Sequence, residues 1–339
     1  MTSVLVDLSM SVVIIYLTKQ PQIGSILGMT NIYEPRFLDA DKAREHLEGI
    51  HWPNGPICPH CKGEDCTRLE GKKHRAGLVQ CNDCRKQFTV TVGTVFERSK
   101  VPLNKWLLAT HLMCASKKGI SAHQLHRMLG VTYKTAWFMS HRIREAMKPS
   151  DNGPMGGPGA DVEADETYWG KNPDTKDNRM AMRRMNRIVS LVDRATGRSS
   201  SIVFNGTFNA DTLGRYLLTR VDRRSRLLSD DNNAYKRPGL NFARHGWVNH
   251  TQDEYVSRED PTKHTNTVEG FFGIFKRGMR GIYQHCGQQH LHRYLAEFDF
   301  RYSNRSANGI EDTERADLAL KGISGKRLTY RRTGGLAAA

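Results

Sequence analysis

The stretch Asp161-Val162-Glu163-Ala164-Asp165-Glu166-Thr167-Tyr168-Trp169 decides the fold of the larger part of this chain. Strand alternation places Asp161, Glu163 and Asp165 on one face. Like charges stacked in this way repel one another, so a central strand tolerates them only beside a cation or solvent. A solvated edge strand is the alternative interpretation. The stretch therefore predicts either a cation site inside a sheet or an exposed sheet edge.

The segments around this strand predict a mixed α/β layer architecture. Before it, the Gly- and Pro-rich run 151–159 is a flexible linker and a domain boundary. After it, Ala195-Thr196-Gly197 reads as a hairpin-like turn. We expect strands over 188–193, 201–204, 226–229 and 246–249, and helices over 209–218, 267–279 and 290–302.

Two further acidic positions lie far along the chain from this strand. Asp230 follows the apolar stretch 226–229, at the end of a strand where ligands collect in open α/β sheets; a plain turn explains it equally well. Glu269 lies on the helix that carries Lys276, where Asn266 and Glu269 also have the spacing of a capping box. Together with Asp165, these carboxylates are suited to hold two divalent ions for phosphoryl displacement, and magnesium prefers such oxygen ligands.

Two CxxC pairs precede these elements, Cys58 with Cys61 and Cys81 with Cys84. Two such turns present four thiolates to one ion in a closed tetrahedron, so the spacing predicts one structural zinc ion. Because the segment is too small to fold on an apolar core, the metal would supply its folding energy. The neighbours that could compete as ligands are His60 and Cys66.

The run 119–132 predicts a helix-turn-helix. Ser121 can cap the first helix, Gly130 supplies the turn and Thr132 can cap the second helix. In a recognition helix the N-terminal residues meet base edges, here Tyr133 and Lys134. An ordinary basic helical hairpin is the alternative. The remaining polar residues expected on the exposed side of the second helix are Thr135, His141, Arg142 and Arg144.

The composition favours a nucleic-acid partner and a reducing compartment. Fifty-one Lys and Arg against thirty-five Asp and Glu give a formal net charge of +16, which a polyanion such as DNA would neutralise. Seven cysteines, an odd number with two CxxC pairs, argue against a secreted disulfide framework. The apolar run 12–17 is too short to span a bilayer. Residues 1–28 are expected to be upstream sequence, because Met29 begins a natural-looking start.

Several motifs jointly resemble a family of bacterial insertion-sequence transposases that join a zinc ribbon to a DDE-type domain. The resemblance runs from about Arg36 to Arg305. Its marks include Trp52-Pro53-x-Gly55-Pro56-x-Cys58-Pro59-x-Cys61, Ser116-Lys117-Lys118-Gly119-Ile120-Ser121, Val162-Glu163-x-Asp165-Glu166-Thr167-Tyr168, His264-Thr265-Asn266-Thr267-Val268-Glu269-Gly270-Phe271 and His290-Leu291-His292-Arg293-Tyr294.

This resemblance implies a multidomain α/β protein: a zinc ribbon and helix-turn-helix, then a ribonuclease H-like catalytic domain. It implies catalysis by Asp165, Asp230 and Glu269 with magnesium or manganese, and favours Asp230 over Asp231. Asn266 competes with Glu269 as third member. The expected division is an N-terminal extension over 1–40, a zinc ribbon over 41–98, a helix-turn-helix over 99–148, a linker over 149–160, the catalytic domain over 161–305 and a basic tail over 306–339.

The expected partner is double-stranded DNA. Lys276, seven residues after Glu269, is implied by the resemblance as a DNA contact, and Arg277 follows it on the same helix. Basic residues between the first two strands are expected to grip phosphates, although a solvated loop is an alternative for them. They are Arg179, Arg183, Arg184 and Arg187.

The expected function is a transposase that binds terminal inverted repeats, hydrolyses the phosphodiester at the element's end and joins the freed 3′-hydroxyl to target DNA. Pairing two ends requires at least a dimer, and the expected location is the nucleoid of the bacterial cytoplasm. The alternative is a DNA-binding regulator, derived from a transposase, whose nuclease domain is inert.

Overall fold

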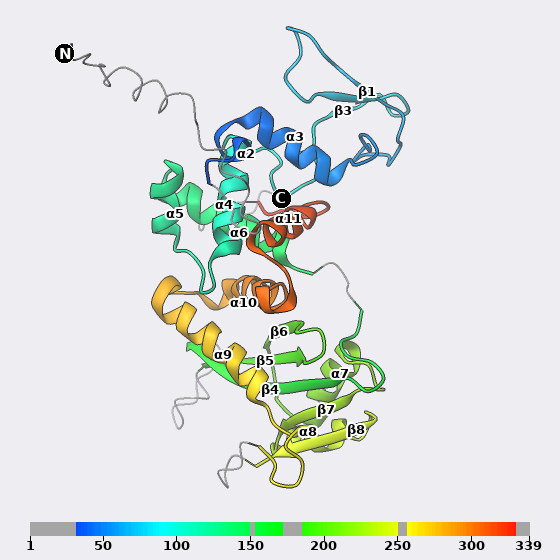
Figure 1. Cartoon of the computed structure of the whole chain (residues 1–339), viewed down its shortest axis with the longest axis vertical. Coiled ribbons are helices and arrows are strands. Elements are labelled where there is room, and N and C mark those ends of the chain that lie inside the picture. Colours follow the sequence, from blue (N-terminus) through cyan, green and yellow to red (C-terminus); the bar gives the residue numbers. More distant parts are fainter. Residues whose placement is uncertain (1–31, 150–152, 172–184, 250–255, 330–339) are drawn as a thin grey trace, which may run out of the picture.

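The structure is a computed structural model that describes residues 32–149, 153–171, 185–249 and 256–329. The molecule has a cysteine-bearing ribbon at one end, a group of helices in the middle and a larger sheet at the opposite end (Figure 1). Within the described ranges, no helix has the length and apolar character needed to cross a bilayer.

The ribbon is a small antiparallel sheet of three strands. They are β1 (Cys66–Arg68), β2 (Val79–Cys81) and β3 (Gln87–Phe88). Cys66 lies opposite Cys81 in the register, and Trp52 packs edge-on against Phe88 with 5.8 Å between ring centroids. The strand β3 ends at Phe88, although the polar/apolar alternation Gln87-Phe88-Thr89-Val90-Thr91-Val92 predicts a strand to Val92, because hydrogen bonds such as that from the Val92 N–H to the Thr89 carbonyl fold the chain into turns.

The central part of the molecule is a helical core built from both ends of the described chain. Its helices are α2 (Pro35–Leu38), α3 (Ala40–His51), α4 (Leu103–Ala115), α5 (Ala122–Leu129), α6 (Tyr133–Met147) and α11 (Asp312–Lys321). Leu47 of α3, Trp106 and Met113 of α4, Ile143 of α6 and Leu320 of α11 are buried in one apolar cluster. The helix α11 lies within the stretch expected to be a basic tail, so that expectation was wrong for residues 312–321.

The helices α5 and α6 form the expected helix-turn-helix. The Ser121 hydroxyl accepts a hydrogen bond from the Gln124 N–H, and the Thr132 hydroxyl accepts one from the Thr135 N–H. Gly130 has a φ of +60°, the left-handed conformation in which a glycine ends a helix without steric cost. The two predicted caps and the predicted turn are thereby confirmed.

The second half of the chain forms a mixed sheet of five strands. They are β4 (Asp161–Lys171), β5 (Met185–Asp193), β6 (Ser199–Phe204), β7 (Arg226–Asp230) and β8 (Arg244–Val248). Their order is β6-β5-β4-β7-β8, with β4, β5 and β6 antiparallel and β4, β7 and β8 parallel. The strand β4 therefore lies in the middle of the sheet, and the alternative of a solvated edge strand was wrong.

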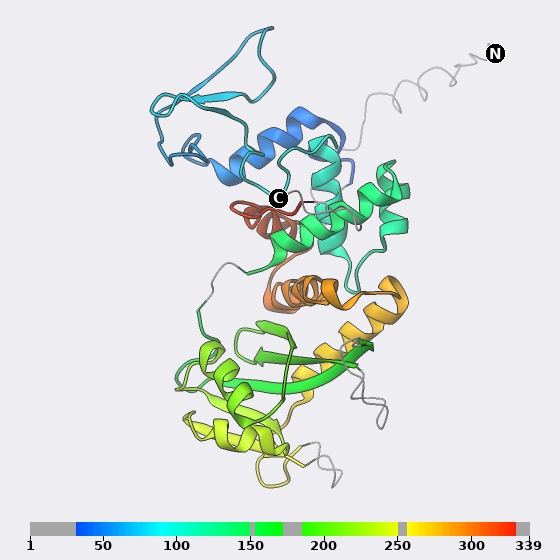
Figure 2. The ribbon, with the colours of Figure 1, turned by 180° about the vertical axis from the view of Figure 1, so that it is seen from behind.

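Helices cover both faces of this sheet (Figure 2). They are α7 (Ala210–Arg220), α8 (Asn233–Gly239), α9 (Asn266–Gly278) and α10 (Gln288–Ser303). Val162 and Ala164 of β4 pack with Leu213 of α7 and Tyr235 of α8 in one apolar core. A second core joins β5 to α9 and α10 on the other face. This mixed α/β arrangement agrees with the ribonuclease H-like fold that the resemblance implies.

Local sequence signals missed three parts of this region. The helix α8 follows Asp230 directly, where the sequence favoured turns. A π-helical turn, η3 (Met279–Tyr283), extends α9. Met155, from the expected linker, is buried beside Val221 in the first core of the sheet. The burial of Met155 depends on contacts with distant segments, whereas α8 has a local start signal in Asn232, whose side chain accepts a hydrogen bond from the Ala234 N–H.

Candidate active site

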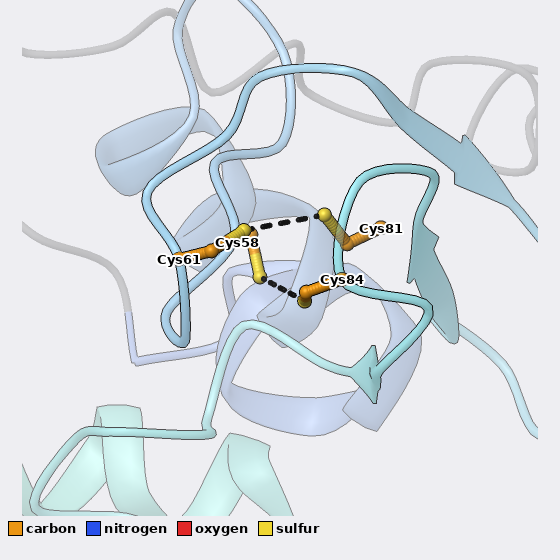
Figure 3. A group of neighbouring side chains, drawn as sticks. All are labelled: Cys58, Cys61, Cys81 and Cys84. Atoms are coloured by element: carbon orange, nitrogen blue, oxygen red, sulfur yellow. Dashed lines mark hydrogen bonds between the residues drawn. The ribbon is translucent and has the colours of Figure 1, made fainter.

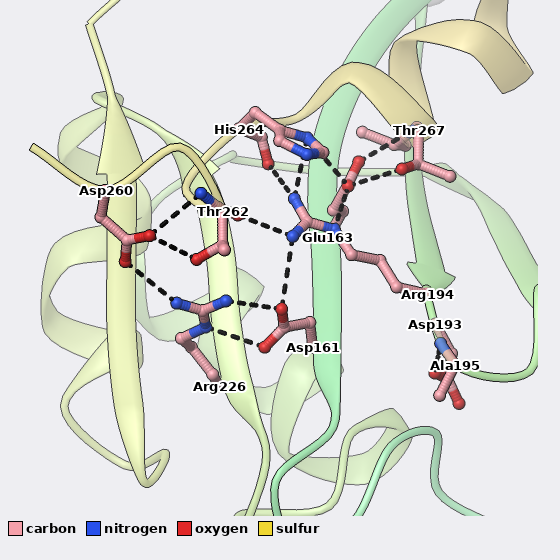
Figure 4. A network of polar contacts seen from close by, with 11 residues as sticks. Asp161, Glu163, Asp193, Arg194, Ala195, Arg226, Asp260, Thr262, His264 and Thr267 are labelled. Atoms are coloured by element: carbon pink, nitrogen blue, oxygen red, sulfur yellow. Dashed lines mark hydrogen bonds and ion pairs between the residues drawn. The ribbon is translucent and has the colours of Figure 1, made fainter. Parts of the chain in front are cut away.

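Two of the three acidic residues on one face of β4 are neutralised by arginines (Figure 4). Asp161 accepts a hydrogen bond from the Arg226 Nη2 at 2.6 Å, and Arg194 contacts it as well. Glu163 is fully buried and accepts from the Arg194 Nε at 2.6 Å. The cations that a central strand requires at these two positions are therefore side chains of neighbouring segments.

Glu163 also holds the start of α9 against β4. Its carboxylate accepts hydrogen bonds from the Thr267 hydroxyl at 2.7 Å and from the Val268 N–H at 2.8 Å. Thr265, which precedes the helix, makes no side-chain cap. A carboxylate from another strand thus satisfies a free N–H of the first helical turn, where negative charge is stabilising. This contact fixes the position of Glu269, one residue beyond Val268, relative to β4.

The third acid on that face, Asp165, lies among other carboxylates. Glu163 pairs with Leu228 in the parallel register of β4 and β7, so Asp165 falls level with Asp230 at the end of β7. Carboxylate oxygens of Asp165, Glu166 and Asp230 lie within 4.8 Å of one another. The parallel pairing of β4 with β7 therefore brings together residues that are separated by 65 positions in the sequence, in the middle of β4 and at the end of β7.

Electrostatics at this cluster favour a bound cation. Burial raises the pKa of Asp165 well above its usual range, and the charges of Glu166, Asp230 and Glu269 raise it further. Burial and the charge of Asp230 also raise the pKa of Glu166, against the hydrogen bonds that its carboxylate accepts. A divalent cation would relieve this accumulation of negative charge. The carboxylate oxygens present are the donors that magnesium and manganese prefer, so the residues fit such an ion.

Glu166 is a member of the cluster that the sequence analysis did not assign. The side-chain amide of Asn232 donates to its Oε1 at 2.8 Å, and the hydroxyl of the buried Tyr235 donates to its Oε2 at 2.9 Å. Strand alternation places Glu166 on the face of β4 opposite Asp165, so the sequence pattern did not predict that the two carboxylates would lie in one cluster. The available signal was the pair of adjacent acids, Asp165 and Glu166, in the middle of one strand.

Glu269 and Asn266 occupy the first two turns of α9 and differ in their surroundings. Asn266 is exposed, whereas Glu269 is half-buried and its Oε1 accepts a hydrogen bond from the Thr265 hydroxyl at 2.9 Å. The helix begins at Asn266, so Asn266 is not the residue before the helix and the capping box suggested by the spacing is not formed. Of the two, Glu269 is the residue whose charge acts on Asp165.

The four cysteines of the two CxxC pairs form one group (Figure 3). Their sulfur atoms lie within 4.8 Å of one another, with 3.6 Å between Cys58 and Cys84 and 3.5 Å between Cys61 and Cys81. A tetrahedral zinc ion with Zn–S bonds of about 2.3 Å requires sulfur separations of roughly 3.8 Å. The arrangement therefore fits zinc. The alternative ligand Cys66 lies outside this group, and its thiol contacts the Gly63 carbonyl instead.

The residues expected to contact DNA are distributed unevenly. Tyr133 and Lys134 are exposed at the start of α6, and Arg277 is exposed on α9 beside the half-buried Lys276. Arg142 is half-buried, and its guanidinium donates to the main-chain carbonyls of Glu97 and Leu328. Arg187 donates to the Tyr168 hydroxyl and lies over the Phe208 ring. The others, Arg179, Arg183 and Arg184, lie outside the described residues.

Two polar residues of α6 are buried rather than exposed. Arg144 donates to Glu297 of α10 at 2.7 Å, and both side chains are at most 3% exposed. His141 packs against His290, at the start of α10, with 4.9 Å between ring centroids. The expectation that Arg144 and His141 lie on the exposed side of the helix was wrong, because the back of α6 packs on α10. The predicted DNA-binding helix thus has a buried contact with α10, the helix that packs on the sheet.

Comparisons with known proteins find two transposase domains and a relative from a transposable element. Residues 38–87 match the transposase zinc-ribbon domain, and residues 156–303 match the ISXO2-like transposase domain. A protein of Halobacterium salinarum, described as an uncharacterized protein in transposable element ISH50, is 28% identical over 297 residues, covering 78% of this chain and 91% of the relative. A chain of the simian T-cell lymphotropic virus intasome, solved in complex with PP2A regulatory subunit B56 gamma, is 18% identical with a TM-score of 0.27, over 52% of this chain and 63% of that chain.

Proposed function

Because this chain belongs to the insertion-sequence transposases that combine a zinc ribbon with a DDE-type domain, we propose that it cleaves DNA at the ends of a mobile element and joins those ends to target DNA. One observation carries the catalytic part of this proposal. On the acidic face of β4, Asp161 and Glu163 are paired with arginines, whereas Asp165 is half-buried beside Glu166 and Asp230.

The proposed catalytic residues are Asp165, Asp230 and Glu269, with Glu166 as a fourth carboxylate. Asp165 and Asp230 hold their positions through the paired strands, and Glu269 is held through the contact of Glu163 with α9. Two divalent cations bound there would supply a polarised attacking oxygen and stabilise the leaving oxygen in a phosphoryl transfer. The role of the chain is to hold the carboxylates in place and to keep the arginines away from Asp165.

The zinc ribbon and the helix-turn-helix are proposed to recognise the terminal inverted repeats. The four clustered cysteines would hold a single zinc ion that stabilises the ribbon. Tyr133 and Lys134 lie at the exposed start of α6, where a recognition helix meets base edges. Pairing two ends for one strand-transfer event requires at least two copies of the chain.

A cleavage and strand-transfer assay on duplexes that carry the element's ends tests this function. We expect Asp165→Asn, Asp230→Asn and Glu269→Gln each to reduce both products by at least a hundredfold, with DNA binding retained. Asn266→Ala is the matched control for the third acid and should keep near-normal activity. A second control is Asp211→Asn, an exposed carboxylate paired with Arg237.

The controls also separate this function from that of an inert regulator. Wild-type protein that binds the ends but yields neither product with magnesium or manganese supports the regulator. Loss of activity in Asn266→Ala, with Glu269→Gln active, contradicts the assignment of the third acid. Equal products from wild type and Asp165→Asn contradict the whole site.

A further inference from the structure

A hollow of about 640 Å³ lies beside the first turns of α6, away from the acidic cluster. Four of its lining side chains are cationic, namely Arg98, Lys100, Lys134 and Arg142, and no Asp or Glu is among the residues that line it. Trp106 and Phe138 supply apolar surface to the same hollow. Neither the acidic site nor the cysteine group uses any of these residues.

This hollow continues toward the zinc ribbon. A second hollow, of about 330 Å³, shares Arg98, Ser99, Val101 and Trp106 with the first. Beyond these shared residues it is lined by ribbon residues, including Arg75, Thr89 and Thr91, and by one acid, Glu97. The two hollows adjoin at these four shared residues, and together they are here called the basic groove, which has α6 at one end and the ribbon at the other.

The cations of the basic groove divide into two kinds. The Arg142 guanidinium is committed to the carbonyls of Glu97 and Leu328, so it supports the wall of the groove. Lys100 and Lys134 are exposed. The Arg98 side chain is 79% exposed, and its ion pair with Glu97, at 3.6 Å, is an exposed contact of the kind that contributes little free energy. Three cationic side chains are therefore available to a ligand.

We propose that the basic groove binds the phosphate backbone of duplex DNA, so that one duplex contacts both α6 and the zinc ribbon. Exposed Lys and Arg side chains that line one groove are the usual partners of phosphates, and such contacts orient a protein on DNA without reading its sequence. Lys134 is one of the two residues proposed above to lie near base edges, and its place in the first turn of α6, where the helix dipole favours a phosphate, lets it contact the backbone as well. This inference rests on the proposed function, because it describes where the DNA on which the chain acts would cross the protein surface.

The salt dependence of DNA binding tests this path. Each phosphate contact contributes about 0.9 to the slope of log K against log salt, so loss of one contact weakens binding about eightfold at 0.1 M salt. We expect Arg98→Ala, Lys100→Ala and Lys134→Ala each to lower the slope by about one. Fluorescence anisotropy with the full zinc-loaded chain measures this between 0.1 and 0.4 M NaCl, on an end-containing duplex and a random duplex of equal length.

Two comparisons make the result specific. Lys42→Ala removes an exposed lysine of α3 that lines neither hollow, and it should keep the wild-type slope. Lys100→Ala should weaken both duplexes by the same factor, because a backbone contact carries no base preference. Slopes equal to wild type in all three groove variants, with native zinc content and circular dichroism, overturn the proposed path.

The failure of this path and the failure of the proposed function are distinguishable. Reduced slopes together with no cleavage by the wild-type protein leave the basic groove in place and remove the catalytic role. Unchanged slopes together with cleavage that depends on Asp165 remove the groove and leave the catalytic role. Cleavage by Lys100→Ala that recovers at saturating protein concentration supports both.

Discussion

Replacing Glu163 by glutamine tests how the sheet positions α9. The Glu163 carboxylate is fully buried and accepts hydrogen bonds from Arg194, Thr267 and the Val268 N–H at 2.6, 2.7 and 2.8 Å. An amide keeps a single acceptor oxygen, and its NH₂ group must face one of these donors. Either orientation leaves a buried donor without a partner and removes the nearer of the two carboxylates that pair with Arg194, so that only Asp161 remains, at 3.3 Å.

The magnitude follows from these contacts. A buried donor left unsatisfied costs about 1–3 kcal/mol, and a hydrogen bond to a charged group contributes about 1.5–3 kcal/mol. The Arg194 side chain is 18% exposed, so water offsets part of the second loss. We expect a net loss of roughly 3 kcal/mol for Glu163→Gln. For a domain of this size, that loss lowers the melting temperature by about 6–12 °C.

Thermal unfolding of the full zinc-loaded chain measures this loss, with Asp211→Asn as the matched carboxylate-to-amide control. Asp211 is 71% exposed in the first turn of α7, so its replacement should cost only about 0.3–1 kcal/mol and lower the melting temperature by about 1–4 °C. We also expect Glu163→Gln to require more divalent cation for half-maximal cleavage, because α9 carries Glu269. A Glu163→Gln variant with the melting temperature and the cation dependence of the wild type would refute the conclusion that Glu163 holds α9 against β4.

Three further outcomes follow from buried or clustered groups. Glu297→Gln should lower the free energy of unfolding in urea by about 3–5 kcal/mol, because it leaves the buried Arg144 and Arg301 without a carboxylate partner. Arg144→Met should cost less, because Glu297 keeps its pair with Arg301. A larger loss in Arg144→Met than in Glu297→Gln contradicts this reasoning. Burial raises the pKa of Asp299 to about 6, so the native state holds that proton more tightly than the unfolded chain. Stability should fall by roughly 3 kcal/mol as pH rises from about 4 to 6 and through that pKa, and Asp299→Asn should flatten the dependence in urea titrations. Cys81→Ser should lose zinc by atomic absorption and expose the ribbon to protease, whereas Cys66→Ser should keep its zinc; equal zinc content in both argues against the assigned ligand group.

Local features of the fold were predictable from the sequence. The caps at Ser121 and Thr132 and the turn at Gly130 depend on hydrogen bonds and dihedral angles within a few residues. The spacing of the two CxxC pairs predicted a single group of four cysteines, and their sulfur atoms lie together as expected. Buried segments such as α11 and Met155 were not predictable, because their burial comes from contacts with helices and strands far away in the sequence.

The acidic site was predictable in part. Alternation placed Asp161, Glu163 and Asp165 on one face of β4, but it could not say which acids face arginines and which face other acids. That distinction depends on Arg194 and Arg226, which come from other parts of the sheet. The inclusion of Glu166 and the capping of α9 by Glu163 likewise depend on how the sheet and helix meet.

Anomalous diffraction from crystals of the full chain soaked in manganese chloride tests the central claim most directly. We expect an anomalous peak in contact with the carboxylates of Asp165 and Asp230, and its loss in Asp165→Asn crystals. Carboxylates that meet without an anomalous peak at millimolar manganese, or an arginine side chain placed between them, would contradict it.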